Sequence, residues 1–332
     1  MMETNHKLQD FYFKKFSSHN IQNIVHLSGD ASTRQYFRVV TSNDSYIICQ
    51  DAPFLENEAS HPFLQNQKIL KDNNFLVPEI YFSDLSKGLI LQEDLGDISL
   101  IKYNNQFNDT LKEYENYKKC VDTLVDFHKI DSSKNSKKLF TNLYFDKEKY
   151  FFEINMTLEY FFKNLMKNER NNILIRKEFE KIVDPIVAKK MIYTHRDFHS
   201  RNIMVKNGKF YLIDFQDARM GIPQYDLVSL LEDCYFSIEN KNKDKLIEYY
   251  FEICSKKMSD QSREEFLKLY DYMAIERVFK AIGSFAYIYF SKKDLRYIRY
   301  IGFGMEKIRN ILNKHSELAN LRSLIFEIYN EY

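Results

Sequence analysis

The feature that most constrains the fold of this chain is a predicted β-hairpin over residues 203–213. Two apolar runs, residues 203–206 and 209–213, flank the dipeptide Asn207-Gly208. Asn-Gly between two such runs favours a tight turn in which both residues take positive φ angles. The hairpin folds the chain back on itself, so we expect the residues at its two ends, Asn202 and Asp214, to lie side by side.

Polar residues gather around this hairpin. Asp197 lies on the loop before the first strand, and the second strand leads into Ile213-Asp-Phe-Gln-Asp217. One carboxylate that can face a hydroxyl, beside an Asn/Asp pair, is the arrangement that phosphoryl transfer uses. Asp197 would accept the proton of the acceptor hydroxyl, while Asn202 and Asp214 would hold a Mg²⁺ ion that bridges the nucleotide phosphates. The alternative interpretation is an ordinary β-hairpin with polar loop residues.

Three motifs carry a family resemblance. They are His195-Arg-Asp-Phe-His-Ser-Arg-Asn202, Ile213-Asp-Phe-Gln-Asp-Ala218 and Tyr225-Asp-Leu-Val-Ser-Leu-Leu-Glu-Asp-Cys-Tyr235. They resemble the kinase-like phosphotransferases of the aminoglycoside phosphotransferase and choline kinase type. Within that superfamily the chain is most similar to the bacterial anomeric kinases of N-acetylmuramate and N-acetylglucosamine, which belong to peptidoglycan recycling. The resemblance extends over nearly the whole chain.

The resemblance implies an α+β, protein-kinase-like fold with two lobes. Residues 1–95 would form a small nucleotide-binding lobe with an antiparallel sheet, and residues 96–332 a larger, mostly helical lobe with the catalytic loop and the substrate pocket. It also implies ATP and Mg²⁺ as cofactors and an amino sugar as the substrate. Choline, ethanolamine and aminoglycosides remain alternative substrates, and a nucleotide-binding scaffold without turnover remains the alternative to an enzyme.

The predicted nucleotide side lies in the first lobe. Strands are expected at residues 24–27, 35–40, 46–50, 78–82 and 88–92, after a helix at residues 5–19. The small residues between the first two strands can offer backbone N–H groups to phosphates, so Ser32, Thr33 and Arg34 are candidate contacts. By resemblance, the backbone from Glu93 to Leu95 forms the hinge that reads the adenine edge.

One position departs from the usual kinase-like pattern. The third strand of such folds ends in a Lys that holds the phosphates, whereas this chain has Gln50. A neutral amide cannot supply that charge, which motivates the scaffold alternative. Arg34 or Arg38 could provide the cation instead, and the strand alternation does not distinguish between them.

Candidate substrate residues lie in the helical lobe. Asp217 could support the metal or bind substrate, and Arg201 is predicted to line the catalytic loop. Residues 145–166 are rich in aromatic side chains, which favours helices packed in a core; by resemblance the same segment helps to wall the sugar pocket, with Glu153 as a candidate contact.

A second block, Glu276-Arg277-Val278-Phe-Lys-Ala-Ile-Gly283, resembles the family pattern Gln-Arg-His-x-Lys-x-x-Gly. Arg277 is therefore a further candidate contact to the substrate, although Glu276 and Val278 differ from the pattern. Gly283 within a helical pattern indicates the close approach of another helix or of a sugar ring. Helices are expected at residues 243–257, 261–290 and 302–331.

Two other residues have structural explanations. Asp226 is expected to be the N-cap of a helix beginning at Leu227, and by resemblance it also braces the catalytic loop. His195 and His199 are four residues apart, but they precede a hairpin on a loop and no third Cys or His is near in sequence. A zinc site is therefore not expected.

Charge and composition exclude several classes of protein. The chain has 48 basic and 47 acidic residues, which argues against a dedicated nucleic-acid binder. Residues 226–332 hold equal numbers of each, which argues against a polycationic aminoglycoside as the substrate. No apolar run approaches the length of a membrane span, no signal peptide is indicated, and the four cysteines are scattered. We expect a cytoplasmic monomer that contacts neither nucleic acid nor membrane.

Overall fold

The computed structural model describes residues 2–16, 21–27, 34–56, 58–131, 143–254 and 261–330. The chain divides into two compact units, the first comprising residues 1–100 and 203–216, the second residues 101–202 and 217–332. The predicted boundary between the lobes follows residue 95 and assigns residues 203–216 to the second lobe. The structure instead assigns them to the first unit. The hairpin clusters with the first unit, where Val205 N donates to Ile98 O (2.7 Å) and Leu212 N donates to Leu76 O (2.9 Å).

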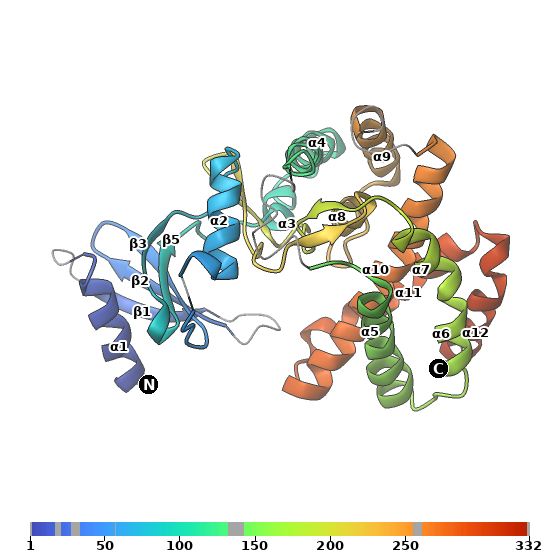
Figure 1. Cartoon of the computed structure of the whole chain (residues 1–332), viewed down its shortest axis with the longest axis horizontal. Coiled ribbons are helices and arrows are strands. Elements are labelled where there is room, and N and C mark those ends of the chain that lie inside the picture. The colour runs from blue at the N-terminus through green and yellow to red at the C-terminus, as the bar shows by residue number, and fades with distance from the viewer. Residues whose placement is uncertain are drawn as a thin grey trace. The chain divides into compact units, whose positions relative to one another are not determined.

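The first unit is built on a five-stranded antiparallel sheet in the order β1-β2-β3-β5-β4. Its elements are α1 (Met2–Phe13), β1 (Ile21–Leu27), β2 (Gln35–Thr41), β3 (Ser45–Gln50), α2 (Pro62–Asp72), β4 (Ile80–Asp84) and β5 (Leu89–Glu93). Successive side chains on a strand point to opposite faces. One face carries Phe37, Val39, Ile48 and Leu91 and packs against α1, whereas α2 lies on the other side of the sheet (Figure 1).

The predicted hairpin is confirmed. Strands β7 (Ile203–Lys206) and β8 (Lys209–Leu212) pair antiparallel, and the turn residues Asn207 and Gly208 have φ angles of 53° and 70°. Lys206 Nζ lies 2.7 Å from Glu93 Oε1 and donates to Asp94 O at 2.9 Å. These contacts fasten the turn of the hairpin to the chain at the end of β5.

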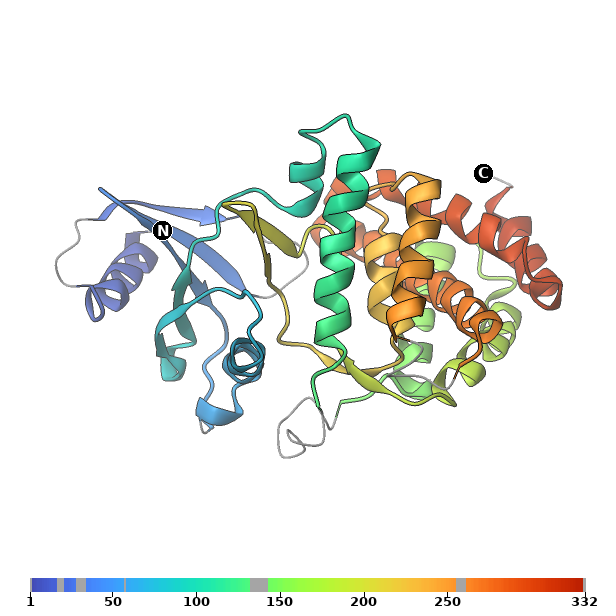
Figure 2. The same cartoon turned by 90° about the horizontal axis from the view of Figure 1, so that it is seen from above.

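The second unit is mostly helical, so the predicted α+β class is confirmed. Its described helices and strands are α3 (Leu100–Asn104, which begins at the last residue of the first unit), α4 (Thr110–Phe127), α5 (Lys147–Thr157), α6 (Asn172–Glu178), α7 (Glu180–Val187), β6 (Ile192–Thr194), β9 (Arg219–Gly221), α8 (Gln224–Leu231), α9 (Asn240–Cys254), α10 (Arg263–Lys292), α11 (Arg299–Leu312) and α12 (Ala319–Tyr329). A π-helical segment, Leu158–Leu165, continues α5. Helices α4 and α9 lie side by side (Figures 1 and 2).

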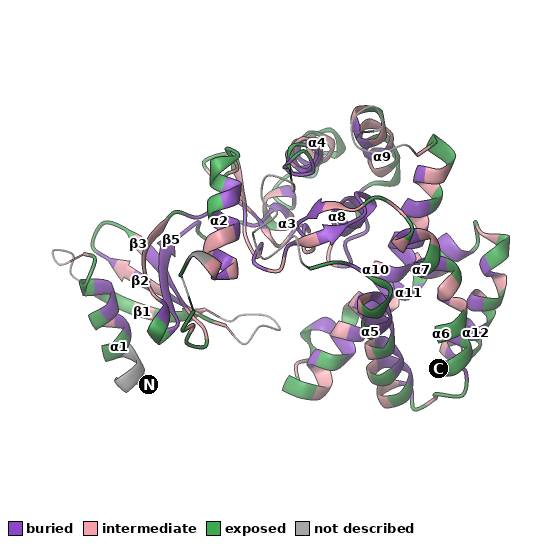
Figure 3. Cartoon of the chain, viewed as in Figure 1, coloured by how far each residue is buried: buried purple, intermediate pink, exposed green. Residues whose placement is uncertain are grey.

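Helices α8 and α10 form the centre of this unit. Every residue of α8 is buried, as the purple ribbon in Figure 3 shows. Helix α10 crosses α5 closely at Gly283, where an added Cβ would lie 2.7 Å from Thr157 Cα. Thr157 Oγ1 also donates to Phe279 O at 2.8 Å. Gly283 therefore accommodates another helix, which was the first of its two predicted explanations.

The single helix predicted for residues 302–331 is wrong. Helix α11 ends at Leu312, and α12 begins only at Ala319. His315 lies between them with an extended backbone, and its Nε2 is 3.0 Å from Asp271 Oδ2 on α10. This contact ties the segment between the two helices to α10. The apolar pattern of residues 302–331 therefore belongs to two helices. Across the described ranges, none of the helices has the length and apolar content needed to span a bilayer.

Candidate active site

The loop that carries Asp197 is held by a buried carboxylate. Asp226 accepts hydrogen bonds from His195 N (2.7 Å) and Arg196 N (2.9 Å), and its Oδ2 lies 3.1 Å from His128 Nε2. Arg196 has a φ of 77°, a conformation that a side chain rarely adopts without such support. The brace that the family resemblance implied is therefore present in this chain.

The predicted N-cap role of Asp226 is wrong. Helix α8 begins at Gln224, after Pro223, and Asp226 lies within its first turn. Proline presets the backbone angle that starts a helix, which explains why α8 begins earlier than the Asp signal indicated. The carboxylate of Asp226 turns toward the catalytic loop and satisfies two of its backbone N–H groups.

A second carboxylate fixes the other end of the loop. Asp233 Oδ2 accepts from Ser200 N at 3.1 Å and from Ser200 Oγ, and Lys307 Nζ donates to Asp233 O at 3.2 Å. Asp233 is a site residue that was not predicted from the sequence. It lies with Asp226 in the motif from Tyr225 to Tyr235, and that motif was the sequence signal that could have identified it. The loop is thus clamped at both ends by carboxylates of the chain itself.

Asp197 is an ionised carboxylate surrounded by cations. Arg277 Nη2 lies 3.1 Å from Oδ1, Arg196 Nε lies 3.8 Å from Oδ2, and the side chain is 21% exposed. Burial alone would raise the pKa of Asp197, but Arg196, Lys280 and Arg277 hold that pKa well below its usual range. The carboxylate is therefore available to accept a hydrogen bond from a hydroxyl and to orient it.

The predicted metal ligands flank the hairpin: Asn202 comes directly before β7, and Asp214 follows β8. In the second unit, Asn202 Nδ2 donates to Asp197 O (3.0 Å), which fixes the orientation of the amide. In the first unit, Asp214 has a φ of 64° and accepts from Gln216 Nε2 at 2.7 Å. Because Ile203 pairs with Leu212 in the hairpin, the chain enters and leaves β7–β8 at the same end.

The donor atoms of these residues suit magnesium. Among the described residues there is no group of three or more His, Cys, Asp or Glu side chains arranged to hold a metal. Magnesium does not need such a cage, since it is usually held by one or two protein oxygens together with phosphates and water. Asn202 and Asp214 offer an amide oxygen and a carboxylate, so the residues fit Mg²⁺ bound with a nucleotide and fit zinc poorly.

The first unit presents one arginine beside Gln50. Arg34 Nε lies 2.7 Å from Asp51 Oδ2, directly after the strand end at Gln50. Arg38 is held by two carboxylates, with Nε 2.6 Å from Asp94 Oδ2 and Nη2 2.9 Å from Asp97 Oδ1. Both arginines are therefore paired with carboxylates, and Arg34 is the one whose partner directly follows the strand end at Gln50.

The face of β2 that carries Tyr36 lies close to Asp214. Burial, then the neighbouring Cys49 and the charge of Asp214, raise the pKa of Tyr36. Arg34 and Tyr36 are two residues apart in this nearly extended stretch, so both are on the face opposite α1. The Glu93 side chain is engaged by Lys206, and Leu95 is buried. Ser32 and Thr33 lie outside the described residues.

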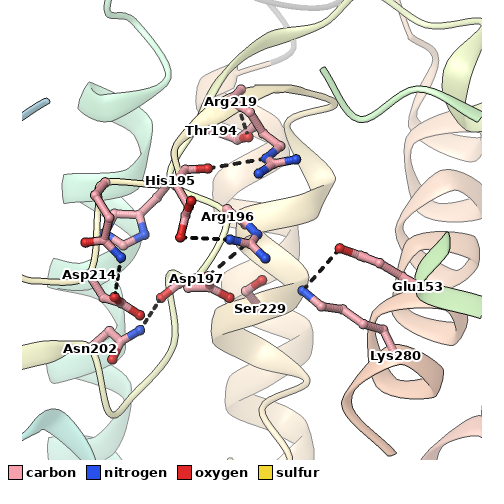
Figure 4. A network of polar contacts seen from close by, with 12 residues as sticks. Glu153, Thr194, His195, Arg196, Asp197, Asn202, Asp214, Arg219, Ser229 and Lys280 are labelled. Carbon is pink, nitrogen blue, oxygen red and sulfur yellow. Dashed lines mark hydrogen bonds and ion pairs between the residues drawn. The ribbon is translucent and has the colours of Figure 1, made fainter. Parts of the chain in front are cut away.

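The four candidate substrate residues are placed differently. Arg277 contacts Asp197, and Asp217 Oδ2 lies 3.1 Å from Arg196 Nη1. Glu153 is buried, with Oε1 3.2 Å from Lys149 Nζ. Arg201 instead stacks its guanidinium 3.9 Å from the ring centre of Tyr235. Arg277, Asp217 and Glu153 thus belong to one polar network around Asp197, whereas Arg201 belongs to an aromatic cluster. Figure 4 shows Glu153, Arg196 and Lys280 of this network beside Asp197.

Comparison with known proteins assigns the chain to a family. Residues 23–277 match the phosphotransferase enzyme family, which is well over half of the chain. The chain belongs to this family. The N-acetylmuramate/N-acetylglucosamine kinase of Neisseria meningitidis is 28% identical to this phosphotransferase over 306 residues, which cover 91% of this chain and 89% of that protein.

Two solved structures show the same fold. The choline kinase LicA from Streptococcus pneumoniae has a TM-score of 0.61 and 17% identity, and the match covers 92% of this chain and 99% of that chain. A thermostable mutant of aminoglycoside phosphotransferase APH(4)-Ia, in a ternary complex with ADP and hygromycin B, has a TM-score of 0.59 and 12% identity, covering 92% and 98%. The predicted family resemblance and the protein-kinase-like fold are confirmed.

The phosphotransferase also buries two ionisable groups of α10 that the sequence analysis did not assign to the site, Glu276 and Lys280. Glu276 is 0% exposed, and neither of its carboxyl oxygens has a hydrogen-bond partner among the described residues. Burial, followed by the charge of Glu153, raises the pKa of Glu276 to about 8. Glu276 is therefore a neutral carboxylic acid at pH 7, with the shape of the Gln that the family pattern has at this position.

Replacing Glu276 with Gln should stabilise the phosphotransferase increasingly as the pH rises. Below about pH 4.5 both the folded and the unfolded chain hold the proton. Between that pH and about 8 only the folded chain does, so folding stability falls with pH through this window. A glutamine at this position has no such dependence. We expect Glu276→Gln to gain on the order of 3 kcal/mol over wild type on going from about pH 5 to about pH 8.

Urea unfolding at the two pH values measures this difference. Glu252→Gln, on the exposed side of α9, is the matched control and should show no comparable change. The charged groups that face Glu276 are Glu153 and Lys149 from α5 and Arg277 and Lys280 from α10. A stability difference that does not grow with pH would mean that Glu276 is ionised in the folded protein.

Proposed function

We propose that this phosphotransferase uses ATP and Mg²⁺ to phosphorylate the anomeric hydroxyl of N-acetylmuramate or N-acetylglucosamine. The observation that carries the proposal is the ionised Asp197 on a loop clamped by Asp226 and Asp233. The relative from Neisseria meningitidis, which matches along most of both chains, supports the choice of acceptor. The family resemblance of the three sequence motifs extends this proposal to a place in peptidoglycan recycling.

In this mechanism the residues of the chain position the reactants and neutralise charge. Asp197 accepts a hydrogen bond from the acceptor hydroxyl, aligns its oxygen with the terminal phosphate and receives its proton. Asn202 and Asp214 would hold Mg²⁺, which when bound would supply positive charge to the phosphates. Arg34 supplies the cation that Gln50 cannot, and the backbone of Glu93 to Leu95 reads the adenine. The clamps on the loop keep Asp197 in place during the reaction.

The acceptor meets the network around Asp197. Arg277 contacts Asp197, so an acceptor hydroxyl would share that carboxylate with a donor of the chain itself. We propose Arg277, Asp217 and Glu153 as the residues that surround the sugar. Arg201 acts at a distance, because its guanidinium is packed among tyrosines and orients the loop next to Asn202.

The aromatic cluster argues against choline as the acceptor. Quaternary ammonium groups are recognised by aromatic cages. Tyr235, Tyr297 and Tyr300 surround the guanidinium of Arg201, with ring centres 3.9, 5.6 and 6.0 Å from its Cζ. A cation of the chain itself therefore occupies this cluster. The equal numbers of acidic and basic residues in 226–332 likewise offer no surplus of negative charge to an aminoglycoside.

The four cysteines support a reducing compartment. Cys49, Cys120, Cys234 and Cys254 are buried and unbridged, and free thiols of this kind are typical of cytosolic proteins. We therefore propose that the enzyme works in the cytoplasm, where ATP is available.

An ADP-release assay with a panel of acceptors tests the proposed function. The panel contains N-acetylmuramate, N-acetylglucosamine, choline, ethanolamine and kanamycin, each with ATP and Mg²⁺. We expect at least one of the two sugars to exceed every other acceptor in kcat/KM by about 10-fold or more. A higher kcat/KM for choline or kanamycin would contradict the proposal, and tight ATP binding without any product would favour the scaffold alternative.

A further inference from the structure

The network beneath Asp197 contains more positive than negative charge. Its cations are Lys149, Arg196, Arg219, Arg277 and Lys280, and its ionised carboxylates are Glu153, Asp197 and Asp217. Glu276 adds no negative charge at neutral pH, because burial keeps it protonated. All of these residues belong to the second unit.

Each carboxylate of this network already has a close cation. Arg277 is 3.1 Å from Asp197, Arg196 is 3.1 Å from Asp217, and Lys149 is 3.2 Å from Glu153. Two cations of the network, Lys280 and Arg219, are less well compensated. Lys280 shares Glu153 Oε1 with Lys149 and lies farther from it, at 3.7 Å.

Lys280 is the more deeply placed of these two. Its Nζ lies 3.3 Å from Tyr225 Oη and 3.7 Å from Glu153 Oε1, the oxygen that Lys149 approaches more closely. Figure 4 shows Lys280 and Glu153 extending toward each other beside Asp197. The Lys280 side chain is only 10% exposed, although an ammonium group has three donors to satisfy.

A buried ammonium without full compensation is costly. Burial, followed by the neighbouring Arg277, lowers the pKa of Lys280 to about 8, which expresses that cost. The cost would be offset by a ligand that brings a negative charge to this position. Lys280 and Glu153 come from α10 and α5, two helices of the unit that also carries Asp197, so the charge would belong to the acceptor side of the reaction.

We propose that Lys280 binds a carboxylate of the acceptor and thereby makes the enzyme prefer an acidic amino sugar to its neutral counterpart. The proposal rests on the proposed function, because it takes Asp197 as the residue that faces the acceptor. N-acetylmuramate has a carboxylate that N-acetylglucosamine lacks, while both have the same N-acetylated ring. The two sugars therefore measure the contribution of the charge.

The test compares wild type, Lys280→Met and Lys149→Met with both sugars. Methionine retains most of the side-chain volume and removes the charge, and an uncharged residue at a buried position should not prevent folding. Lys149 is the matched control, because it contacts the same oxygen of Glu153, whereas the cations that lower the pKa of Asp197 include Lys280 and not Lys149. Lys280 also helps to keep Asp197 ionised, so Lys280→Met will reduce turnover of both sugars to a common extent. Beyond that common loss, we expect kcat/KM for N-acetylmuramate to fall by about 10-fold or more relative to kcat/KM for N-acetylglucosamine. Lys149→Met should leave the ratio of the two unchanged.

Other outcomes overturn the proposal in distinguishable ways. An equal loss with both sugars, together with a raised KM for ATP, would mean that Lys280 serves the phosphates. An unchanged ratio without any loss would mean that it binds no ligand. If wild type phosphorylates neither sugar, the proposed function fails. Calorimetric titration then measures the affinity of wild type for each sugar without turnover. Equal affinity for both sugars would contradict the proposal that Lys280 binds the carboxylate.

Discussion

Replacing Asp197 with Asn should lower kcat by at least about 10²-fold while the protein stays folded. Asparagine keeps the shape of the side chain but cannot accept the proton of the acceptor hydroxyl. The loop should keep its position, because its clamps use Asp226 and Asp233 and involve backbone groups of His195, Arg196 and Ser200. Steady-state ADP release at saturating acceptor measures the effect.

The matched control for this variant is Asp126→Asn, an exposed aspartate on α4. It should keep wild-type kcat. Near wild-type turnover by Asp197→Asn would remove Asp197 from the mechanism. Thermal unfolding of the variant separates a catalytic effect from a loss of structure, since its Tm should remain within a few degrees of wild type.

Replacing Asp214 with Ala should abolish measurable turnover and remove the magnesium dependence of ATP binding. The variant loses the carboxylate that we propose as a metal ligand, and Asn202 alone offers only one neutral oxygen. We expect a decrease in kcat of at least about 10³-fold, because the charge on the phosphates is no longer neutralised in the transition state. Titration of ATP with and without chelator, in wild type and variant, measures the coupling to Mg²⁺.

Two further variants make this result interpretable. Asp72→Ala removes an exposed aspartate of α2 in the same unit and should leave turnover and magnesium dependence unchanged. Asp214→Asn retains the volume at a position with positive φ, where Asn is well tolerated, and should also be inactive. ATP binding by wild type that is insensitive to chelator would exclude Asn202 and Asp214 as the metal site.

The parts that were predictable from sequence depend on short-range signals. Asn207-Gly208 determines the turn of the hairpin by local backbone preference, and the hairpin determines where Asn202 and Asp214 leave it. The prediction of the hairpin needed only neighbouring residues, and the structure agrees with it.

The parts that were not predictable depend on how distant elements pack. Asp226 has the local signature of an N-cap, but its partners are backbone groups of a loop that is distant in sequence. The paired burial of Glu276 and Lys280 follows from α10 packing on α5, which no periodicity reveals. Arg201 lies in a motif beside Asn202, yet its partners come from segments after α8 and α10.

Phosphorus NMR of the reaction with ATP, Mg²⁺ and each of the two amino sugars shows which hydroxyl receives the phosphate. We expect a new sugar 1-phosphate resonance, coupled to the anomeric proton, that appears as ADP forms and is absent with Asp197→Asn. A phosphate on any other hydroxyl, or no sugar phosphate from a protein that phosphorylates choline or kanamycin, would contradict the proposed function.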